Sequence, residues 1–330
     1  MEKYIITVLP MIISLLGTSF VLCFLIPVLK SKKMGQKILD IGPRWHKDKE
    51  GTPTMGGIAF LVVITVTAVS FLTGLYLNGT ASRTAFLGML LTSLYALMNG
   101  FIGVTDDLKK FKKKQNEGLT AKEKYLLQLL ISLAYVILLI RLGAADTSLY
   151  IPFLGRTFEL GVLWYPFALL FLTGFGNAVN LTDGIDGLCG SVSAAAAVFF
   201  TAYCLMEGAV GGTVISSALF GGCLGFLVYN IHPARVFMGD TGSLFLGGLI
   251  SGTALALKNP LLLFFVGIVY LLEAASVVIQ VIFFKFTGKR VFLMAPLHHH
   301  FEKKGLSEGK ITLLAVLLTV LFSLIAFFFR

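Results

Sequence analysis

The feature that most constrains this chain is a series of apolar segments, each long enough to cross a lipid bilayer. Segments of about 20 apolar residues span the hydrocarbon core, and ten such windows occur along the sequence. They cover approximately residues 4–29, 56–77, 84–104, 125–143, 160–176, 187–206, 213–230, 241–257, 260–284 and 311–329. With 56% hydrophobic and 13% charged residues, the 330-residue chain cannot cover these segments with polar surface. The sequence therefore predicts an all-α polytopic integral membrane protein with about ten transmembrane helices.

The first segment is expected to remain as the first span. It is too long for the core of a signal peptide, lacks a small-residue cleavage site and ends at Lys30. No tandem repeat, low-complexity tract or soluble domain interrupts the series. We therefore expect a single transmembrane helical domain over residues 1–330.

The ninth segment, residues 260–284, is longer than a perpendicular span requires, which predicts that it is tilted or broken. It also contains Glu273. This carboxylate is interpreted as a structural group facing the bundle, with the alternative that it lines a functional site.

Basic residues predict the orientation. Ten spans place both termini on one side and five loops on the other, and those loops carry 21 of the 27 Lys and Arg residues. The positive-inside rule then puts the loops in the cytoplasm and both termini outside. The five loops are residues 30–55, 105–124, 177–186, 231–240 and 285–310.

The outer connections are short, apart from residues 149–160, which predict a small β-hairpin on the outer surface. Four cysteines lie within apolar spans or at their ends and have no CxxC spacing, so neither a disulfide framework nor a zinc site is indicated. These are Cys23, Cys189, Cys204 and Cys223.

Two adjacent carboxylates, Asp106 and Asp107, appear where the third apolar segment stops. Adjacent anions repel unless a cation lies between them, and ionisable groups at the membrane are candidates for a functional site. The alternative is that the pair only ends a helix. Favouring function, similar polar groups recur where later segments meet inner loops, at residues 180–186, 239–242 and 298–300.

Two inner loops have two interpretations each. In residues 51–57, glycines and a proline would let backbone N–H groups face a ligand, or would simply turn the chain into the second span. Lys49 just upstream is a phosphate contact or one more positive-inside residue. Most lysines of residues 105–124 are explained by the positive-inside rule and by attraction to anionic lipid headgroups. The alternative for one or two of them is that they hold the phosphates of a substrate.

The remaining inner loops carry acids and histidines. Asp183 and Asp186 are three residues apart, a spacing that places both on one helical face, although Asp183 could instead cap the sixth span. Asp240, close to two glycines at the start of the eighth span, could cap that helix or bind Mg²⁺. Residues 298–300 hold three of the chain's five histidines.

These loops gather carboxylates, amides, lysines and histidines on one face of the bundle. Hard carboxylate oxygens suit Mg²⁺, and Mg²⁺ with lysines suggests phosphates. Phosphoryl transfer depends mainly on positioning and charge neutralisation. Because the chain has no Walker motif and no Gly-rich kinase loop, a nucleotide would dock on the membrane face, with a lipid phosphate as the acceptor.

Five motifs in order carry a resemblance over essentially the whole chain. They are GTPTMGG at 51–57, TDDLKK at 105–110, GNAVNLTDGIDGL at 176–188, MGDTGS at 238–243 and PLHHHFE at 296–302. The sequence resembles the polyprenyl-phosphate N-acetylhexosamine-1-phosphate transferases and, within them, the phospho-N-acetylmuramoyl-pentapeptide transferase family. The resemblance implies a Mg²⁺-dependent enzyme of peptidoglycan and cell-wall synthesis. Such an enzyme transfers phospho-N-acetylmuramoyl-pentapeptide from UDP to undecaprenyl phosphate and releases UMP.

The resemblance also implies roles for individual residues. Asp240 is the expected metal ligand, and Asp106 is a base toward the lipid phosphate or a nucleophile in a two-step route. The implied catalytic residues are Asp106, Asp107, Asp240 and His298. The implied substrate-binding residues are Lys49, Thr54, Lys110, Lys122, Asn177, Asn180, Asp183, Asp186, Asn230, His299 and His300.

Two alternatives differ in substrate or class. A UDP-N-acetylglucosamine transferase would share the acidic core, but the matches at residues 51–57 and 296–302 favour the muramoyl-peptide donor. A cation-coupled transporter would place acids deep in several spans, often in two related halves, whereas only Glu273 is that deep. We expect a multi-pass protein of the bacterial cytoplasmic membrane with its active site on the cytoplasmic face. A homodimer through outer helices is a further hypothesis, and no nucleic-acid partner is expected.

Overall fold

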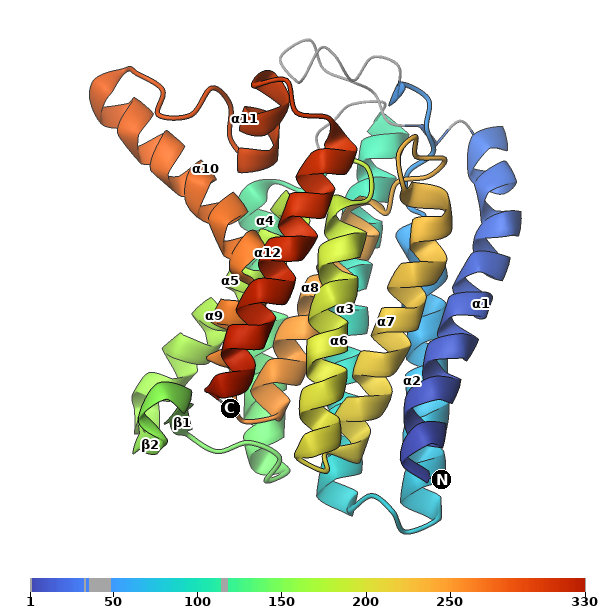
Figure 1. Cartoon of the computed structure of the whole chain (residues 1–330), viewed down its shortest axis with the longest axis vertical. Coiled ribbons are helices and arrows are strands. Elements are labelled where there is room, and N and C mark those ends of the chain that lie inside the picture. Colours follow the sequence, from blue (N-terminus) through green and yellow to red (C-terminus); the bar gives the residue numbers. More distant parts are fainter. Residues whose placement is uncertain (1, 33, 36–48, 114–117, 330) are drawn as a thin grey trace.

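The structure is a computed structural model that describes residues 2–32, 34–35, 49–113 and 118–329. Within these residues the chain forms a helical bundle (Figure 1). The long helices are α1 (Glu2–Ser31), α2 (Gly57–Leu77), α3 (Arg83–Lys113), α4 (Ala121–Arg141), α5 (Trp164–Thr182), α6 (Leu188–Met206), α7 (Val210–Asn230), α8 (Gly239–Ala256), α10 (Ile268–Thr287) and α12 (Glu308–Phe328). Two shorter helices are α9 (Leu262–Val266) and α11 (Leu297–Lys303).

Each apolar window of the sequence corresponds to a helix. Within the described ranges, nine helices are long and apolar enough to cross a membrane. The tenth, α8, is glycine-rich and buried over almost its whole length. The ninth window is divided into α9 and α10 at Gly267, which confirms the expected break. The prediction of a polytopic helical membrane protein is therefore confirmed.

Helix α8 lies at the centre of the bundle because small residues let its neighbours come close. A Cβ on Gly103 of α3 would lie 2.2 Å from the carbonyl oxygen of Asp240, and a Cβ on Gly57 of α2 would lie 2.3 Å from the Cα of Gly242. A Cβ on Gly247 would likewise meet the backbone of α5 at 2.8 Å. These approaches bring the first turn of α8 directly against α3.

The two ends of the bundle differ. Strands β1 (Ser148–Ile151) and β2 (Arg156–Glu159) form an antiparallel hairpin with Leu149 opposite Phe158, which confirms the predicted hairpin. A short 3₁₀ turn (Pro152–Leu154) connects the strands, and a second one (Gly161–Leu163) leads into α5. Both chain ends lie toward the hairpin end, whereas α11 lies at the opposite end, where α10 leans away from the bundle (Figure 1).

Two predicted inner loops are wrong in part. Helix α3 continues to Lys113, so Asp106 and Asp107 lie within it, and α5 continues to Thr182, so Asn180 is helical. Hydropathy falls at these polar residues, but their side chains are paired across the bundle and the helices do not end there. Residues 33, 36–48 and 114–117 of the predicted loops 30–55 and 105–124 lie outside the described residues.

Candidate active site

Asp107, on α3, lies against the first turn of α8. Its Oδ1 accepts the backbone N–H of Asp240 at 3.3 Å. Its Oδ2 accepts the backbone N–H of Thr241 at 3.0 Å and the Oγ1 hydroxyl of Thr241 at 2.8 Å. The first N–H groups of a helix have no partner within the helix, and a carboxylate there also complements the helix dipole. Asp107 thus holds the helix that carries Asp240.

Asp106, one residue earlier, faces a different set of groups. Its buried Oδ1 accepts the backbone N–H of Leu119 at 2.7 Å. Its Oδ2 lies 2.6 Å from the Nζ of Lys110, an ion pair without hydrogen-bond geometry. Gly118 covers this carboxylate closely, since a Cβ there would lie 2.5 Å from Oδ1. The two neighbouring aspartates therefore have separate partners.

Asp240 joins three other helices. Its Oδ2 lies 3.0 Å from the Nζ of Lys110 on α3 and 2.8 Å from the Nζ of Lys124 on α4. Its Oδ1 accepts the side-chain N–H of Asn180 on α5 at 3.0 Å. Asn180 also donates to the hydroxyl of Ser243 at 2.7 Å. The position of this carboxylate is consequently fixed by contacts from three neighbouring helices.

The site fits a divalent cation. Carboxylate oxygens of Asp106, Asp107 and Asp240 lie within 4.8 Å of one another. With Lys110 and Lys124, the three carboxylates sum to one negative charge, so a divalent cation would leave one positive charge for phosphate. Oxygen ligands of this kind suit hard cations. Both carboxylate oxygens of Asp107 already accept hydrogen bonds from α8. The oxygens of Asp106 and Asp240 are therefore the candidates to hold the ion.

Asp183 lies in the turn between α5 and α6. It forms the C-cap of α5, and Gly187, with φ 75°, is the N-cap of α6, so the proposed N-cap role of Asp183 is wrong. The shared helical face expected for Asp183 and Asp186 is also wrong, because neither lies in a helix. Burial, together with the carboxylates of Asp240, Asp107 and Asp186, raises the pKa of Asp183 to about 8.

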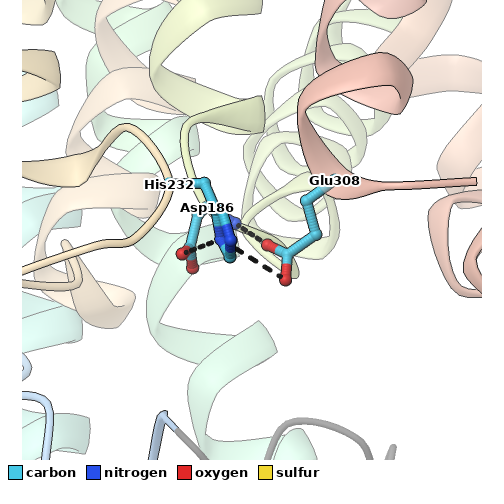
Figure 2. A group of neighbouring side chains, drawn as sticks. All are labelled: Asp186, His232 and Glu308. Atoms are coloured by element: carbon cyan, nitrogen blue, oxygen red, sulfur yellow. Dashed lines mark hydrogen bonds and ion pairs between the residues drawn. The ribbon is translucent and has the colours of Figure 1, made fainter.

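A second cluster lies beside this turn and comprises Asp186, His232, Glu308 and Lys49 (Figure 2 shows the first three). The Nζ of Lys49 lies 2.7 Å from Asp186 Oδ1 and 2.6 Å from Glu308 Oε2. His232 Nδ1 lies 3.0 Å from Asp186 Oδ2, which also accepts the backbone N–H of Ala234. Two carboxylates and an imidazole could hold a metal, but the ammonium group of Lys49 already pairs with both carboxylates. The cluster joins the start of α12 to the turn before α6.

Two amides from the sequence motifs are occupied by protein groups. Asn177 donates through Nδ2 to Gln128 Oε1 at 2.9 Å and to the carbonyl of Thr173 at 2.8 Å. Asn230 accepts the N–H of Gly187 at 3.1 Å and donates to a carbonyl six residues later. Both side chains therefore hold helices and turns together.

The segment 51–57 pairs with the chain just before α8. Gly56 N–H donates to the carbonyl of Phe237 at 2.8 Å, and Gly57 N–H donates to that of Met238 at 3.1 Å. The expectation that these N–H groups face a ligand is wrong, and the turn into the second span is the correct interpretation. Thr54 does lie at the site, because a Cβ on Gly239 would be 2.9 Å from its Oγ1.

The three histidines of α11 have different surroundings. His298 is buried, and its Nδ1 lies 3.1 Å from Oε2 of Glu273 on α10. His299 Nδ1 lies 2.6 Å from Glu302, one turn away. His300 Nδ1 accepts the backbone N–H of Leu293 at 3.1 Å. Only His298 is thus tied to a membrane helix by these contacts.

Comparisons with known proteins show the family of this chain. The family model described as Glycosyl transferase family 4 matches residues 86–258, and phospho-N-acetylmuramoyl-pentapeptide-transferase signature 1 matches residues 49–61. The phospho-N-acetylmuramoyl-pentapeptide-transferase of Clostridium perfringens (strain SM101) is 42% identical over 97% of this chain and 95% of its own length. Those of Acetivibrio thermocellus and Desulforamulus reducens are 43% and 45% identical, over 92% and 91% of this chain and 89% and 88% of their own. The chain belongs to the phospho-N-acetylmuramoyl-pentapeptide-transferase family.

In this member of the transferase family, the structure gathers seven of the fifteen predicted site residues into two clusters. Asp106, Asp107, Lys110, Asn180 and Asp240 form one cluster, as their contacts above show. Lys49 and Asp186 belong to the neighbouring cluster. Lys122 is exposed, and within the described part of the chain it forms no hydrogen bond or ion pair with either cluster; its substrate role stays a prediction.

The sequence reasoning missed Lys124 as a site residue of this transferase-family protein. The N-terminus of α4 is fixed by a capping box, in which Thr120 and Glu123 exchange hydrogen bonds. The helix phase then turns Lys124 inward, one turn before the buried Gln128 and two turns before the buried Ser132. Polar residues four apart in an otherwise apolar helix were the signal that could have found it.

Proposed function

We propose that the protein transfers phospho-N-acetylmuramoyl-pentapeptide from its UDP carrier to undecaprenyl phosphate. The products are undecaprenyl-diphospho-N-acetylmuramoyl-pentapeptide and UMP, and the reaction belongs to peptidoglycan biosynthesis. The observation that carries the proposal is the cluster of Asp106, Lys110, Lys124 and Asp240 at one end of the bundle. The names of the relatives support the choice of substrates.

The metal is proposed to be Mg²⁺, held by Asp240 and Asp106. When bound, the ion supplies positive charge against the diphosphate of the donor. Lys110 and Lys124 have side chains that are 35% and 16% exposed, so their ammonium groups can reach phosphate oxygens from the open side of the cluster. Asn180 keeps the carboxylate of Asp240 oriented when the ion and the phosphates bind.

Asp106 is proposed to act on the lipid phosphate. Its Oδ2 makes no hydrogen bond with good geometry and can accept the proton of the phosphate. The alternative is that Asp106 attacks the donor phosphate in a two-step route. A trapped acyl phosphate that links Asp106 to the phospho-sugar, formed with release of UMP after incubation with donor alone, would establish the second route.

The active site is proposed to face the cytoplasm of a bacterial cell, in the cytoplasmic membrane. The support is the bias of Lys and Arg toward the loops at the cluster end. Single cysteines placed near Lys303 and near Gly79 test the orientation. An impermeant thiol reagent applied to intact cells should label the position near Gly79 and not the one near Lys303, and the opposite pattern contradicts the orientation.

The decisive experiment measures UMP release by the purified, full-length protein in detergent or nanodiscs. With UDP-N-acetylmuramoyl-pentapeptide, undecaprenyl phosphate and Mg²⁺, UMP and a lipid-linked product should form together, and Asp240→Asn should form neither. UDP-N-acetylmuramoyl-pentapeptide and UDP-N-acetylglucosamine are then offered together, and the lipid product is identified by mass spectrometry. A product that carries only N-acetylglucosamine contradicts the donor assignment, and cation flux in proteoliposomes without UMP release would favour a transporter. Mass measurement of the nanodisc particles tests the proposed homodimer.

A further inference from the structure

A buried contact between α10 and α11 has no part in the charge clusters described above. Glu273 is 6% exposed and His298 is 1% exposed. Oε2 of Glu273 lies 3.1 Å from Nδ1 of His298 and accepts the backbone N–H of the same residue at 3.2 Å. A buried carboxylate is costly to desolvate, so two contacts to one histidine indicate a specific arrangement.

The backbone contact determines which ring nitrogen carries the proton. A backbone N–H can only donate, so Oε2 of Glu273 must be an acceptor at this position. An ionised carboxylate has no proton to donate, so the same oxygen also accepts from Nδ1, and Nδ1 of His298 is then protonated. In a neutral ring, Nε2 is then an acceptor.

Nε2 of His298 has no hydrogen-bond partner among the described residues, although it is buried. It points at the turn between α5 and α6, where a Cβ on Gly184 would lie 2.1 Å from it. This turn connects Asp183 to Asp186 and thus lies between the two charge clusters. Buried polar atoms are nearly always bonded, so an unpaired one beside a site needs an explanation.

We propose that Glu273 is a positioning residue of the transferase. It holds His298 with Nδ1 protonated, so that Nε2 accepts a hydrogen bond from a hydroxyl or amide N–H group of the bound sugar-peptide donor. The inference rests on the proposed function and adds to it a residue from the membrane-embedded part of α10. It also explains why a carboxylate is placed in that span.

Substitutions at Glu273 separate hydrogen bonding from charge. Glu273→Gln keeps an acceptor oxygen for both N–H groups, whereas Glu273→Leu has similar size and no acceptor. We expect Glu273→Gln to keep kcat within about threefold of wild type and Glu273→Leu to lower it about 100-fold, the usual scale for a lost preorganised hydrogen bond. Wild-type kcat in Glu273→Leu, or an equal loss in both variants, overturns the proposal.

Substitutions at His298 separate the proposal from a purely structural role. The amide nitrogen of Asn stands near the place of Nδ1, so His298→Asn retains the contact to Glu273 but has no atom at Nε2. We expect the thermal unfolding midpoint of His298→Asn to stay near wild type while kcat falls about 100-fold. If His298→Asn keeps wild-type kcat, the contact only anchors α11.

A spectroscopic measurement tests the tautomer without the reaction. The ¹⁵N chemical shifts of His298, assigned by difference from His298→Asn, should show protonated Nδ1 and unprotonated Nε2 in wild type. Glu273→Leu should populate both tautomers. A wild-type ring with its proton on Nε2 overturns the proposal, whereas a wild-type protein that releases no UMP overturns the proposed function and leaves the tautomer readable.

Discussion

The carboxylate of Asp107 caps the helix that carries Asp240, accepting the backbone N–H of Asp240 at 3.3 Å and that of Thr241 at 3.0 Å. Asp106, its neighbour in sequence, instead faces Lys110 at 2.6 Å. The adjacent pair thus divides two tasks. Asp107 fixes where Asp240 lies, and Asp106 presents an oxygen toward the lysine side of the cluster.

This division predicts different effects of Asp→Asn changes. In Asp107→Asn one oxygen still accepts, but the charge and one acceptor are lost, so stability should fall by about 0.5–2 kcal/mol, as for other helix caps. Its turnover should fall about 10–100-fold, while Asp240→Asn should lose about 1,000-fold and unfold at the wild-type temperature. UMP release and thermal unfolding are measured for each variant. An Asp107→Asn protein with wild-type stability and the turnover of Asp240→Asn would contradict the cap.

The inward position of Lys124 predicts that its replacement lowers turnover more than replacement of Lys122. Lys124→Ala removes an ammonium group 2.8 Å from Asp240, which leaves excess negative charge where phosphates must bind. Turnover should fall about 100-fold at fixed Mg²⁺ and partly recover when Mg²⁺ is raised. Lys122→Ala, on the exposed side of α4, should lose less, and Lys112→Ala serves as the charge control on α3. A larger loss in Lys122→Ala than in Lys124→Ala would restore the motif-based role of Lys122.

These residues show which parts of the molecule the sequence could predict. Apolar windows predicted every long helix, since the length of a span is set by the bilayer. Asp106 and Asp240 were predicted as site residues because ionisable groups at the edge of a membrane span are costly there and usually have a function. Helix ends were misplaced at Asp106 and Asn180, where polar groups paired across the bundle resemble loop residues.

Other features depend on contacts between distant parts of the chain. Lys49 and Glu308 lie 259 positions apart, and nothing local in either segment indicates their pairing. The expected backbone ligand site at residues 51–57 failed for the same reason, because its N–H groups bond to residues that precede α8. The inward face of Lys124, in contrast, was readable from its spacing to Gln128.

The close approach of α3 to α8 predicts a steric effect at Gly103. A Cβ there would lie 2.2 Å from the carbonyl oxygen of Asp240, so Gly103→Ala must separate the two helices. Overpacking of this kind costs about 1–3 kcal/mol, and turnover should fall with stability because Asp240 moves. Gly74→Ala in α2 is the matched control, since no atom lies within 4 Å of its Cβ position. Equal thermal unfolding midpoints and turnover in the two variants would contradict the proposed tight contact.

The raised pKa of Asp183 predicts a stability that depends on pH. Burial, together with nearby carboxylates, raises this pKa from 3.8 to about 8. Between these two values the folded protein binds a proton that the unfolded chain has released, so stability must fall as the pH rises through this window. Asp183→Asn has no such proton and should lose less stability between pH 6 and pH 9. Thermal unfolding is measured in EDTA, where each kcal/mol corresponds to about 2–4 °C. Adding Mg²⁺ should reduce the difference, because positive charge at the neighbouring Asp240 offsets the repulsion. Parallel unfolding profiles of wild type and Asp183→Asn from pH 6 to pH 9 would show that Asp183 is already ionised in the folded protein.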